Sequence, residues 1–363
     1  MIDEKQKESW FKKLSFKLEH ISFSQKIFLV DNLRVMLKAG LSIIESLEIL
    51  EAQMESAKLK RLIGQARQDV EKGKTLAEAL EKIPELFPSI YVKMIAAGEV
   101  SGKLDESLSE AVIQMKKTYA MNSKIRGAMV YPLVILVAVV GIGIEMMVVV
   151  LPKLLTIFNE MNVAMPLPTR VLIFSSNFLI KYGLLVVIVV AALVALFIKL
   201  KRRPDVQFFL HRVLLKIPVL GHISYQINLA RFSLTLGSLL KSAIPIIDAV
   251  NITADVVSNS LYKNALQNIS QKIKTGVPLS ELLASYPQLF PPLVSQMIMV
   301  GEHSGTLENL LNELSNYYNE EVDQLLKNIS TVIEPIIIII LGVVVGGLAV
   351  AVIMPMYSLT QAI

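Results

Sequence analysis

The chain alternates between long apolar runs and stretches whose apolar residues recur at helical spacing. Three runs are apolar enough to cross a bilayer: residues 132–151, 171–198 and 335–354. Twenty helical residues extend over about 30 Å, which matches the hydrocarbon core of a bilayer. We therefore expect three transmembrane helices.

The more polar stretches between these runs show the helical repeat of three to four residues. In the first stretch the repeat is carried by Leu29, Leu33, Met36 and Leu37. Thr75 and Glu78 have the spacing of a capping box at a helix start. No segment alternates convincingly with period two, so we expect no sheet and a bundle of about six helices before the first span.

The sequence contains an internal repeat. Lys38–Glu45 reappears as Lys241–Asp248, an offset of 241 − 38 = 203 residues. Between residues 73–108 and 276–311, 16 of 36 positions are identical without a gap, whereas chance gives roughly two or three. The expected fold is therefore an all-α membrane protein with two homologous cytoplasmic helical bundles, of about six helices each, and three transmembrane helices.

Basic residues beside the apolar runs predict the orientation and the segments. Lys124 and Arg126 precede the first run, and Lys199–Arg203 follows the second, as is typical of cytoplasmic flanks. Both bundles are then cytoplasmic. The predicted segments are an N-terminal amphipathic or disordered segment (1–23), a first cytoplasmic domain (24–131), the first span (132–151), an extracytoplasmic loop (152–170), the second span (171–198), a cytoplasmic linker (199–225), a second cytoplasmic domain (226–334), the third span (335–354) and an extracytoplasmic tail (355–363).

Composition supports a membrane protein and argues against several kinds of site. The 363 residues are 53% hydrophobic and 18% charged, with a mean hydropathy of +0.55, whereas soluble domains average about 45–50% apolar and 25% charged residues. The chain has no cysteine and only four scattered histidines, so no thiolate or histidine metal site is expected. The net charge of +5 is explained by the membrane flanks, without a nucleic-acid motif. The sequence shows no nucleophile–base pair, phosphate loop or pair of catalytic carboxylates, so we expect neither enzyme activity nor a cofactor.

Several short motifs lie at corresponding places in the two copies. Gly-Glu-x-Ser-Gly-x-Leu occurs at 98–104 and 301–307, each time after Leu-Phe-Pro. The other motifs are Tyr131-Pro132, Pro166-Leu167-Pro168-Thr169, Pro218-x-x-Gly221, Arg231-Phe232 and Glu334-Pro335. With these motifs, residues 25–354 closely resemble the inner-membrane platform family of type II secretion systems and type IV pili. Ala243 departs from the family pattern, which usually has glycine there, and we expect the helix end to tolerate alanine.

The resemblance implies a non-enzymatic platform in the bacterial cytoplasmic membrane. Such a platform couples a cytoplasmic assembly ATPase to the insertion of pilin or pseudopilin subunits into a growing filament. The implied partners are this ATPase, pilins or pseudopilins, other inner-membrane components of the machine, further copies of the chain and the lipid bilayer. The alternative from another class is a membrane transporter or permease subunit with internal parallel repeats, although transporters usually have more spans.

The two repeated turns form the first candidate site. Its residues are Glu99, Ser101, Gly102, Glu302, Ser304 and Gly305. In the structural interpretation, a helix ends near Gly98, each serine N-caps the next helix, and each carboxylate accepts nearby backbone N–H groups. In the functional interpretation, the turns contact the ATPase or a second copy. The presence of the motif in both copies favours the structural role, because only one copy need touch a given partner.

The second candidate site consists of charged residues near the membrane interior. An unpaired ionised carboxylate in a bilayer costs several kcal/mol. By helix rise, Glu145 lies about 20 Å from the cytoplasmic end of its span and Lys181 about 25 Å from that of the next span, so the two could form an ion pair. A further hypothesis is that Glu145 faces the groove through which a pilin helix leaves the membrane.

Prolines mark the expected starts of two spans. These starts are Pro132 and the pair Glu334-Pro335. A carboxylate followed by proline suits the first turn of a helix. Near the N-terminus, the aromatic and basic stretch 10–18 could lie on anionic lipid, be disordered or dock on a partner.

Overall fold

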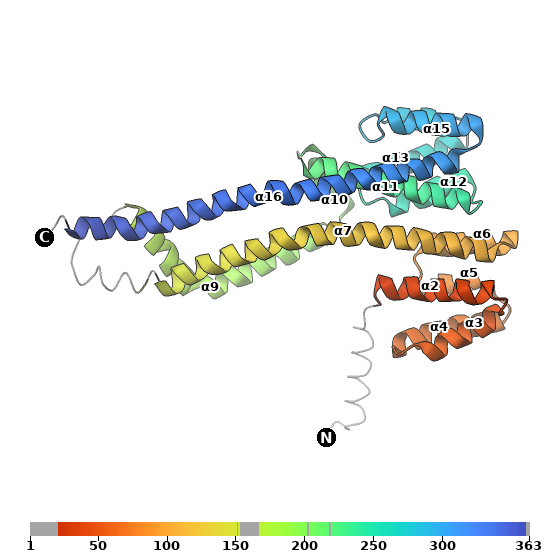
Figure 1. Ribbon diagram of the computed structural model, residues 1–363, viewed down its shortest axis with the longest axis horizontal. Coiled ribbons are helices and arrows are strands. Elements are labelled where there is room, and N and C mark those ends of the chain that lie inside the picture. The colour runs from red at the N-terminus through yellow and green to blue at the C-terminus, as the bar shows by residue number, and fades with distance from the viewer. Residues whose placement is uncertain (1–20, 151, 153–166, 202, 218, 361–363) are drawn as a thin grey trace, which may run out of the picture. The chain divides into compact units, whose positions relative to one another are not determined.

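The computed structural model describes residues 21–150, 152, 167–201, 203–217 and 219–360, and every regular element in these ranges is a helix (Figure 1). The expected N-terminal segment (1–23), extracytoplasmic loop (152–170) and tail (355–363) therefore lie largely or partly outside the described residues. The described residues form two compact units, one within 1–122 and 214–322 and the other within 123–213 and 323–363. The first unit contains both copies of the repeat, which we call the first and second lobes.

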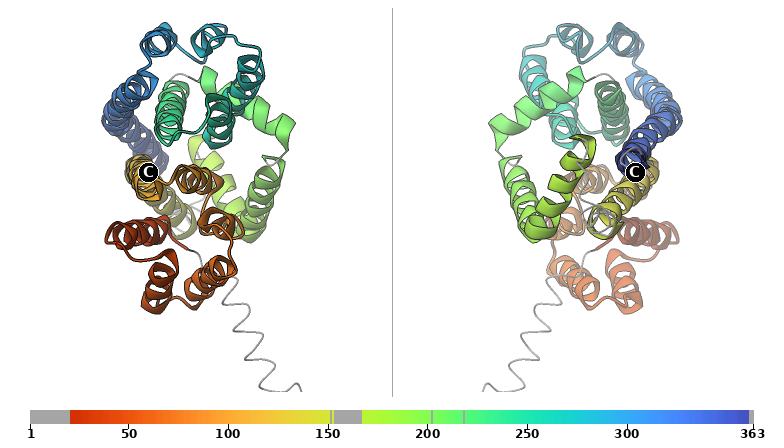
Figure 2. Two further views of the ribbon diagram at one scale, coloured as in Figure 1. Left: turned by 90° about the vertical axis from the view of Figure 1, so that its right-hand side faces the viewer. Right: turned by 90° about the vertical axis from the view of Figure 1, so that its left-hand side faces the viewer.

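The first lobe is a bundle of six helices, which Figure 2 shows nearly end-on. Its helices are α2 (Phe23–Lys38), α3 (Ile43–Gln53), α4 (Ala57–Glu71), α5 (Leu76–Glu81), α6 (Ser89–Ser101) and the first part of α7 (Leu104–Glu145). Apolar residues at helical spacing meet in one core, where Leu29, Leu33 and Leu108 are almost completely buried. An ion pair of 2.7 Å between Asp31 and Lys116 joins α2 to α7.

The second lobe repeats this order of helices. Its helices are α11 (Leu220–Lys241), α12 (Ile246–Val256), α13 (Ser260–Ile273), α14 (Leu279–Ala284), α15 (Pro292–Ser304) and the first part of α16 (Leu307–Thr360). An aromatic cluster fills its core: the ring centroid of Phe290 lies 5.1 Å from that of Phe232 and 5.4 Å from that of Tyr262. The duplication in sequence is therefore a duplication of fold.

Helix ends in the lobes follow local sequence closely. The predicted capping box of Thr75 and Glu78 is formed at the start of α5. Gly40, at φ 90°, follows the end of α2, and Ala243, at φ 58°, occupies the corresponding place after α11. A left-handed backbone conformation strains any residue that carries a Cβ atom. Ala243 therefore carries a conformational cost that Gly40 does not, although α11 ends at the position that corresponds to the end of α2.

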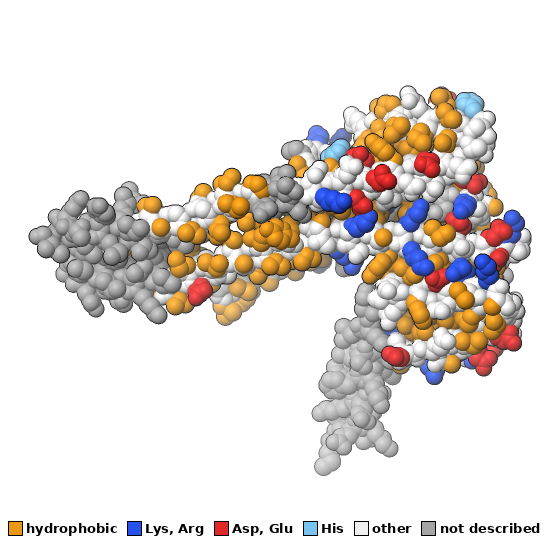
Figure 3. All heavy atoms as spheres, in the orientation of Figure 1, with side chains coloured by type: hydrophobic (Ala, Val, Ile, Leu, Met, Phe, Trp, Pro, Cys, Tyr) orange, Lys and Arg blue, Asp and Glu red, His pale blue; other side chains and the backbone are white. Residues whose placement is uncertain are grey.

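The second unit consists mainly of apolar helix. Here α7 continues to Glu145 and is followed by a π-helix, η1 (Met146–Val150), while α9 covers Leu167–Leu200. Hydrophobic side chains cover most of the described surface of this unit in Figure 3. Two helical segments, Leu104–Val149 and Ile173–Leu200, are long and apolar enough to cross a membrane.

The expected third span, 335–354, falls inside α16. A shorter apolar stretch, Ile337–Gly347, is described there, so the third span stays a prediction. The predicted linker 199–225 contains a helix, α10 (Pro204–Lys216), and α11 begins at Leu220, before the predicted domain start at 226. The sequence did not reveal that α11 begins at Leu220. Residues 204–225 mix apolar and polar residues, so no sharp change in hydropathy marks the start of the second domain.

Candidate functional site

The carboxylate of Glu99 closes the N-terminus of α5. Its Oε1 accepts the backbone N–H of Leu76 at 2.6 Å, and its Oε2 accepts that of Ala77 at 2.8 Å. The first N–H groups of a helix have no partner within the helix, and a negative charge is favourable beside them. Glu99 therefore ties α6 to the short helix that precedes it.

Glu302 makes the same contacts in the second lobe. It accepts the backbone N–H groups of Leu279 at 2.7 Å and Ser280 at 3.2 Å, and also the hydroxyl of Ser280. The N-cap of α14 is Pro278, which has no side-chain hydrogen bond, whereas Thr75 caps α5 through its own hydroxyl. The carboxylate thus carries more of the capping in the second lobe.

The serines of the repeated turns are not N-caps. Ser101 is the last residue of α6, and its hydroxyl donates to the carbonyl of Ala97 at 2.8 Å; the hydroxyl of Ser304 donates to that of Val300 at 2.8 Å. Gly102 and Gly305, at φ 71° and 70°, follow the two helices. Because these left-handed residues end the helices after the serines, α7 begins only at Leu104.

Gly98 lies inside α6 rather than at its end. A Cβ atom at this position would lie 2.4 Å from the Cβ of Ser107 in α7. The glycine is therefore needed for close contact between α6 and α7, a packing reason that the sequence motif did not reveal.

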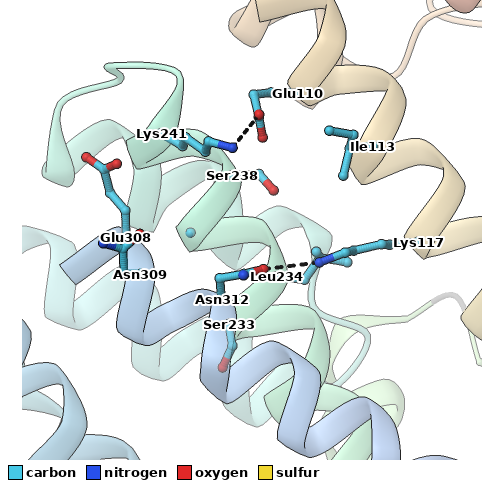
Figure 4. Close-up of a pocket in the computed structure, with 11 residues that line it drawn as sticks. Glu110, Ile113, Lys117, Ser233, Leu234, Ser238, Lys241, Glu308, Asn309 and Asn312 are labelled. Carbon is cyan, nitrogen blue, oxygen red and sulfur yellow. Dashed lines mark hydrogen bonds and ion pairs between the residues drawn. The ribbon is translucent and has the colours of Figure 1, made fainter. Parts of the chain in front are cut away.

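Polar side chains join the two lobes, and several of them line a cavity of about 250 Å³ (Figure 4). Glu110 of α7 pairs with Lys241 of α11 at 2.5 Å, and Lys117 donates to Asn312 of α16 at 3.1 Å. These residues come from segments far apart in the sequence, so no local motif indicated the junction.

The same junction contains buried polar groups. Gln114 of α7 donates to Thr235 of α11 at 3.3 Å, and both side chains are only 1% exposed. Ser233 is fully buried, and its hydroxyl has no hydrogen-bond partner among the described residues. Arg231 donates to Asn122 at 2.8 Å, and burial lowers the pKa of its guanidinium from the ordinary value. One sequence signal could have identified the junction: Gln114 is a polar residue on the apolar stripe of α7.

Glu145 and Lys181 do not form the expected ion pair. Both side chains are exposed, and no hydrogen bond or ion pair links Glu145 to another described residue. The Nζ atom of Lys181 lies 5.5 Å from the ring centroid of Tyr182. Close by, the buried Ser176 of α9 donates to the carbonyl of Met147 in η1, which satisfies a polar backbone group of the π-turn.

The prolines expected at the starts of spans lie inside continuous helices. Pro132 is within α7, and Glu334 and Pro335 are within α16. The interpretation of Glu334-Pro335 as a helix start is therefore wrong. A proline inside a helix removes one hydrogen bond, but the long apolar helices around it continue because all their other backbone groups must pair within the helix.

Among the described residues, no group of three or more histidine, aspartate or glutamate side chains is arranged to hold a metal ion. The polar features described above are helix caps and helix–helix contacts. The candidate site therefore consists of contacts between helices within each lobe and between the two lobes.

Comparison with known proteins places the chain in a family. The profile described as type II secretion system (T2SS), protein F, matches twice, at residues 29–152 and 232–355. The two matches are separated by 232 − 29 = 203 residues, the offset of the internal repeat.

Three curated relatives match most of the chain. A type IV pilus assembly protein PilC of Thermus thermophilus is 35% identical over 90% of this chain and 80% of its own length. PilC of Pseudomonas aeruginosa is 32% identical over 90% and 88%. The type II secretion system protein F of Vibrio cholerae is 29% identical over 94% and 84%. Together with the doubled helical lobe, these matches show that the chain belongs to the type II secretion system protein F family, which includes type IV pilus assembly proteins.

Proposed function

We propose that the chain is a non-enzymatic platform in the bacterial cytoplasmic membrane. It couples a cytoplasmic assembly ATPase to the polymerisation of pilins or pseudopilins, in type IV pilus assembly or type II secretion. Both lobes face the cytoplasm, and a motor acts on them.

One structural observation carries this proposal. In each lobe the last helix does not end with the bundle: α7 continues to Glu145 and α16 to Thr360. Each lobe is thus connected to an apolar segment by one continuous helix. A continuous helix of this kind suits a part that passes mechanical work from a cytoplasmic motor to membrane-embedded subunits.

The first experiment tests the coupling. The tagged full-length chain is expressed in its host without the native copy, and the assembly ATPase is sought after crosslinking and membrane purification. We expect the ATPase to co-purify, and filaments or secretion to depend on the chain. A solute flux in liposomes that contain only this chain, without ATPase binding, would instead support the transporter.

The second experiment tests the orientation and uses the absence of native cysteines. Single cysteines are placed at the exposed positions Lys60 and Gln271, one in each lobe, and at Asn159 in the predicted outer loop. The cells are treated so that the reagent reaches the outer face of an intact cytoplasmic membrane. We expect a membrane-impermeant maleimide to label only Asn159→Cys in these cells, and all three variants after lysis. Labelling of either lobe in intact cells contradicts the proposal.

A further inference from the structure

Two opposite charges are exposed on the apolar helices of the second unit. Glu145 ends α7, next to the exposed Ile144, and Lys181 lies in α9 between the exposed Ile180 and Tyr182. Neither makes a hydrogen bond or an ion pair with another described residue. In a bilayer such charges are costly unless they are paired or reach water.

The two charges lie at nearly the same depth. The hydrogen bond from Ser176 to the carbonyl of Met147 fixes the level of α9 relative to η1. Glu145 lies two residues before Met147 and Lys181 five residues after Ser176, or about 3 Å and about 7.5 Å along their helices. The basic flank precedes the apolar part of α7 and follows the apolar part of α9. Both displacements therefore point toward the side of the membrane where the basic flanks lie. The difference of about 4.5 Å is within the reach of a lysine side chain.

We propose that Glu145 of one copy of the chain forms an ion pair with Lys181 of a neighbouring copy inside the membrane. The charges favour a second copy of the chain as the partner. It presents Lys181 to Glu145, and Glu145 to Lys181, at the same depth in the membrane. Each copy supplies one acid and one base, so either a twofold dimer or a closed ring compensates every charge.

The face of α7 beside Glu145 also permits a close neighbour. Gly141 lies one helical turn before Glu145, and a Cβ atom there would have no other described atom within 4 Å. Small residues let membrane helices approach closely. On α9, Leu185 lies one turn after Lys181 and is 56% exposed. In the proposed contact these two positions face each other.

The experiment uses these flanking positions, so that the charges stay intact. Gly141→Cys and Leu185→Cys are introduced into two differently tagged full-length chains, which are co-expressed and treated in membranes with a short thiol-to-thiol crosslinker. We expect a crosslinked product that carries both tags. Glu145→Gln or Lys181→Gln should reduce its yield several-fold, and the exchange Glu145→Lys with Lys181→Glu in both chains should restore it. Lys199→Gln, at the end of the same helix, is the control and should leave the yield unchanged.

Three results would overturn the pairing. In the first, crosslinking is insensitive to the charges. In the second, a chain carrying both cysteines links only within itself. In the third, the charge variants lose filament assembly while crosslinking persists, which would assign Glu145 to a filament subunit. The readout needs neither a motor nor a filament, so the pairing can fail or hold independently of the proposed function.

Discussion

At the scale of single residues, Glu99 and Glu302 show how a carboxylate can be a structural element. Each accepts two backbone N–H groups at the start of a six-residue helix. Hydrogen bonds to a charged group are stronger than neutral ones, and an unpaired buried donor is costly. The motif is therefore used for folding in both lobes, and a contact with a partner stays a prediction.

We expect Glu99→Ala to lower the free energy of unfolding of the first lobe by about 2 kcal/mol, because two donors lose their acceptor. Thermal unfolding of the detergent-purified chain measures the effect. Glu106→Ala is the matched control: its carboxylate is 66% exposed in a 3.4 Å ion pair, so its loss should cost less than about 0.5 kcal/mol. Equal stability of Glu99→Ala and the parent, with loss of filaments, would support the partner contact instead.

The pair Gly40 and Ala243 isolates the cost of a left-handed backbone. Ala243→Gly should stabilise the second lobe by about 1 kcal/mol, and Gly40→Ala should destabilise the first by a similar amount. A Cβ atom at Gly40 would meet no atom within 4 Å, so the effect is conformational and not steric. Thermal unfolding of the two variants should give shifts of opposite sign, and shifts of the same sign would refute this account.

At the scale of elements, the distance between helices decides which glycines matter. Gly98→Ala forces α6 away from Ser107 and should cost about 1–3 kcal/mol, as overpacking does. Gly127 in α7 has open space around it, so Gly127→Ala should be neutral or slightly stabilising, because alanine favours helix. Chemical denaturation of both variants tests the contrast. A mild effect at Gly98 would show that α7 can shift without cost.

Some helix boundaries depend on local sequence and others on tertiary structure. The sequence predicted the start of α5 because a capping box is a local signal. It misplaced the end of α6, and it interpreted Glu334-Pro335 as the start of a helix. Those features depend on a left-handed glycine after Ser101 and on the continuity of long helices, which local propensity does not report.

At the scale of the whole molecule, polar contacts between α7 and the second lobe lie at the junction of the two lobes. The exposed fractions of the Glu110 and Lys241 side chains are 16% and 58%, and such an ion pair contributes little to stability. The ion pair at the edge of this junction can therefore be reversed by substitution without removing the buried side chains of α7 and α11.

We expect a cysteine in place of Ser233 to react slowly with a soluble maleimide in the parent, because this position is fully buried. Glu110→Lys should increase the labelling rate by repelling Lys241, and the added exchange Lys241→Glu should restore the slow rate. Labelling kinetics of the purified chain provide the measurement, with Gln271→Cys as the exposed reference. A rate unaffected by Glu110→Lys would show that this contact does not hold the lobes together.

The sequence by itself determined the repeat, the all-helical fold and the apolar segments, since identity at a fixed offset, helical periodicity and hydrophobic length are properties of residue order. Only the tertiary structure decided that Glu99 and Glu302 bind the helix before them, that Gln114 meets Thr235, and that Glu145 and Lys181 stay apart within the chain. These relations join residues from different helices. Their distances depend on packing, which no local pattern specifies.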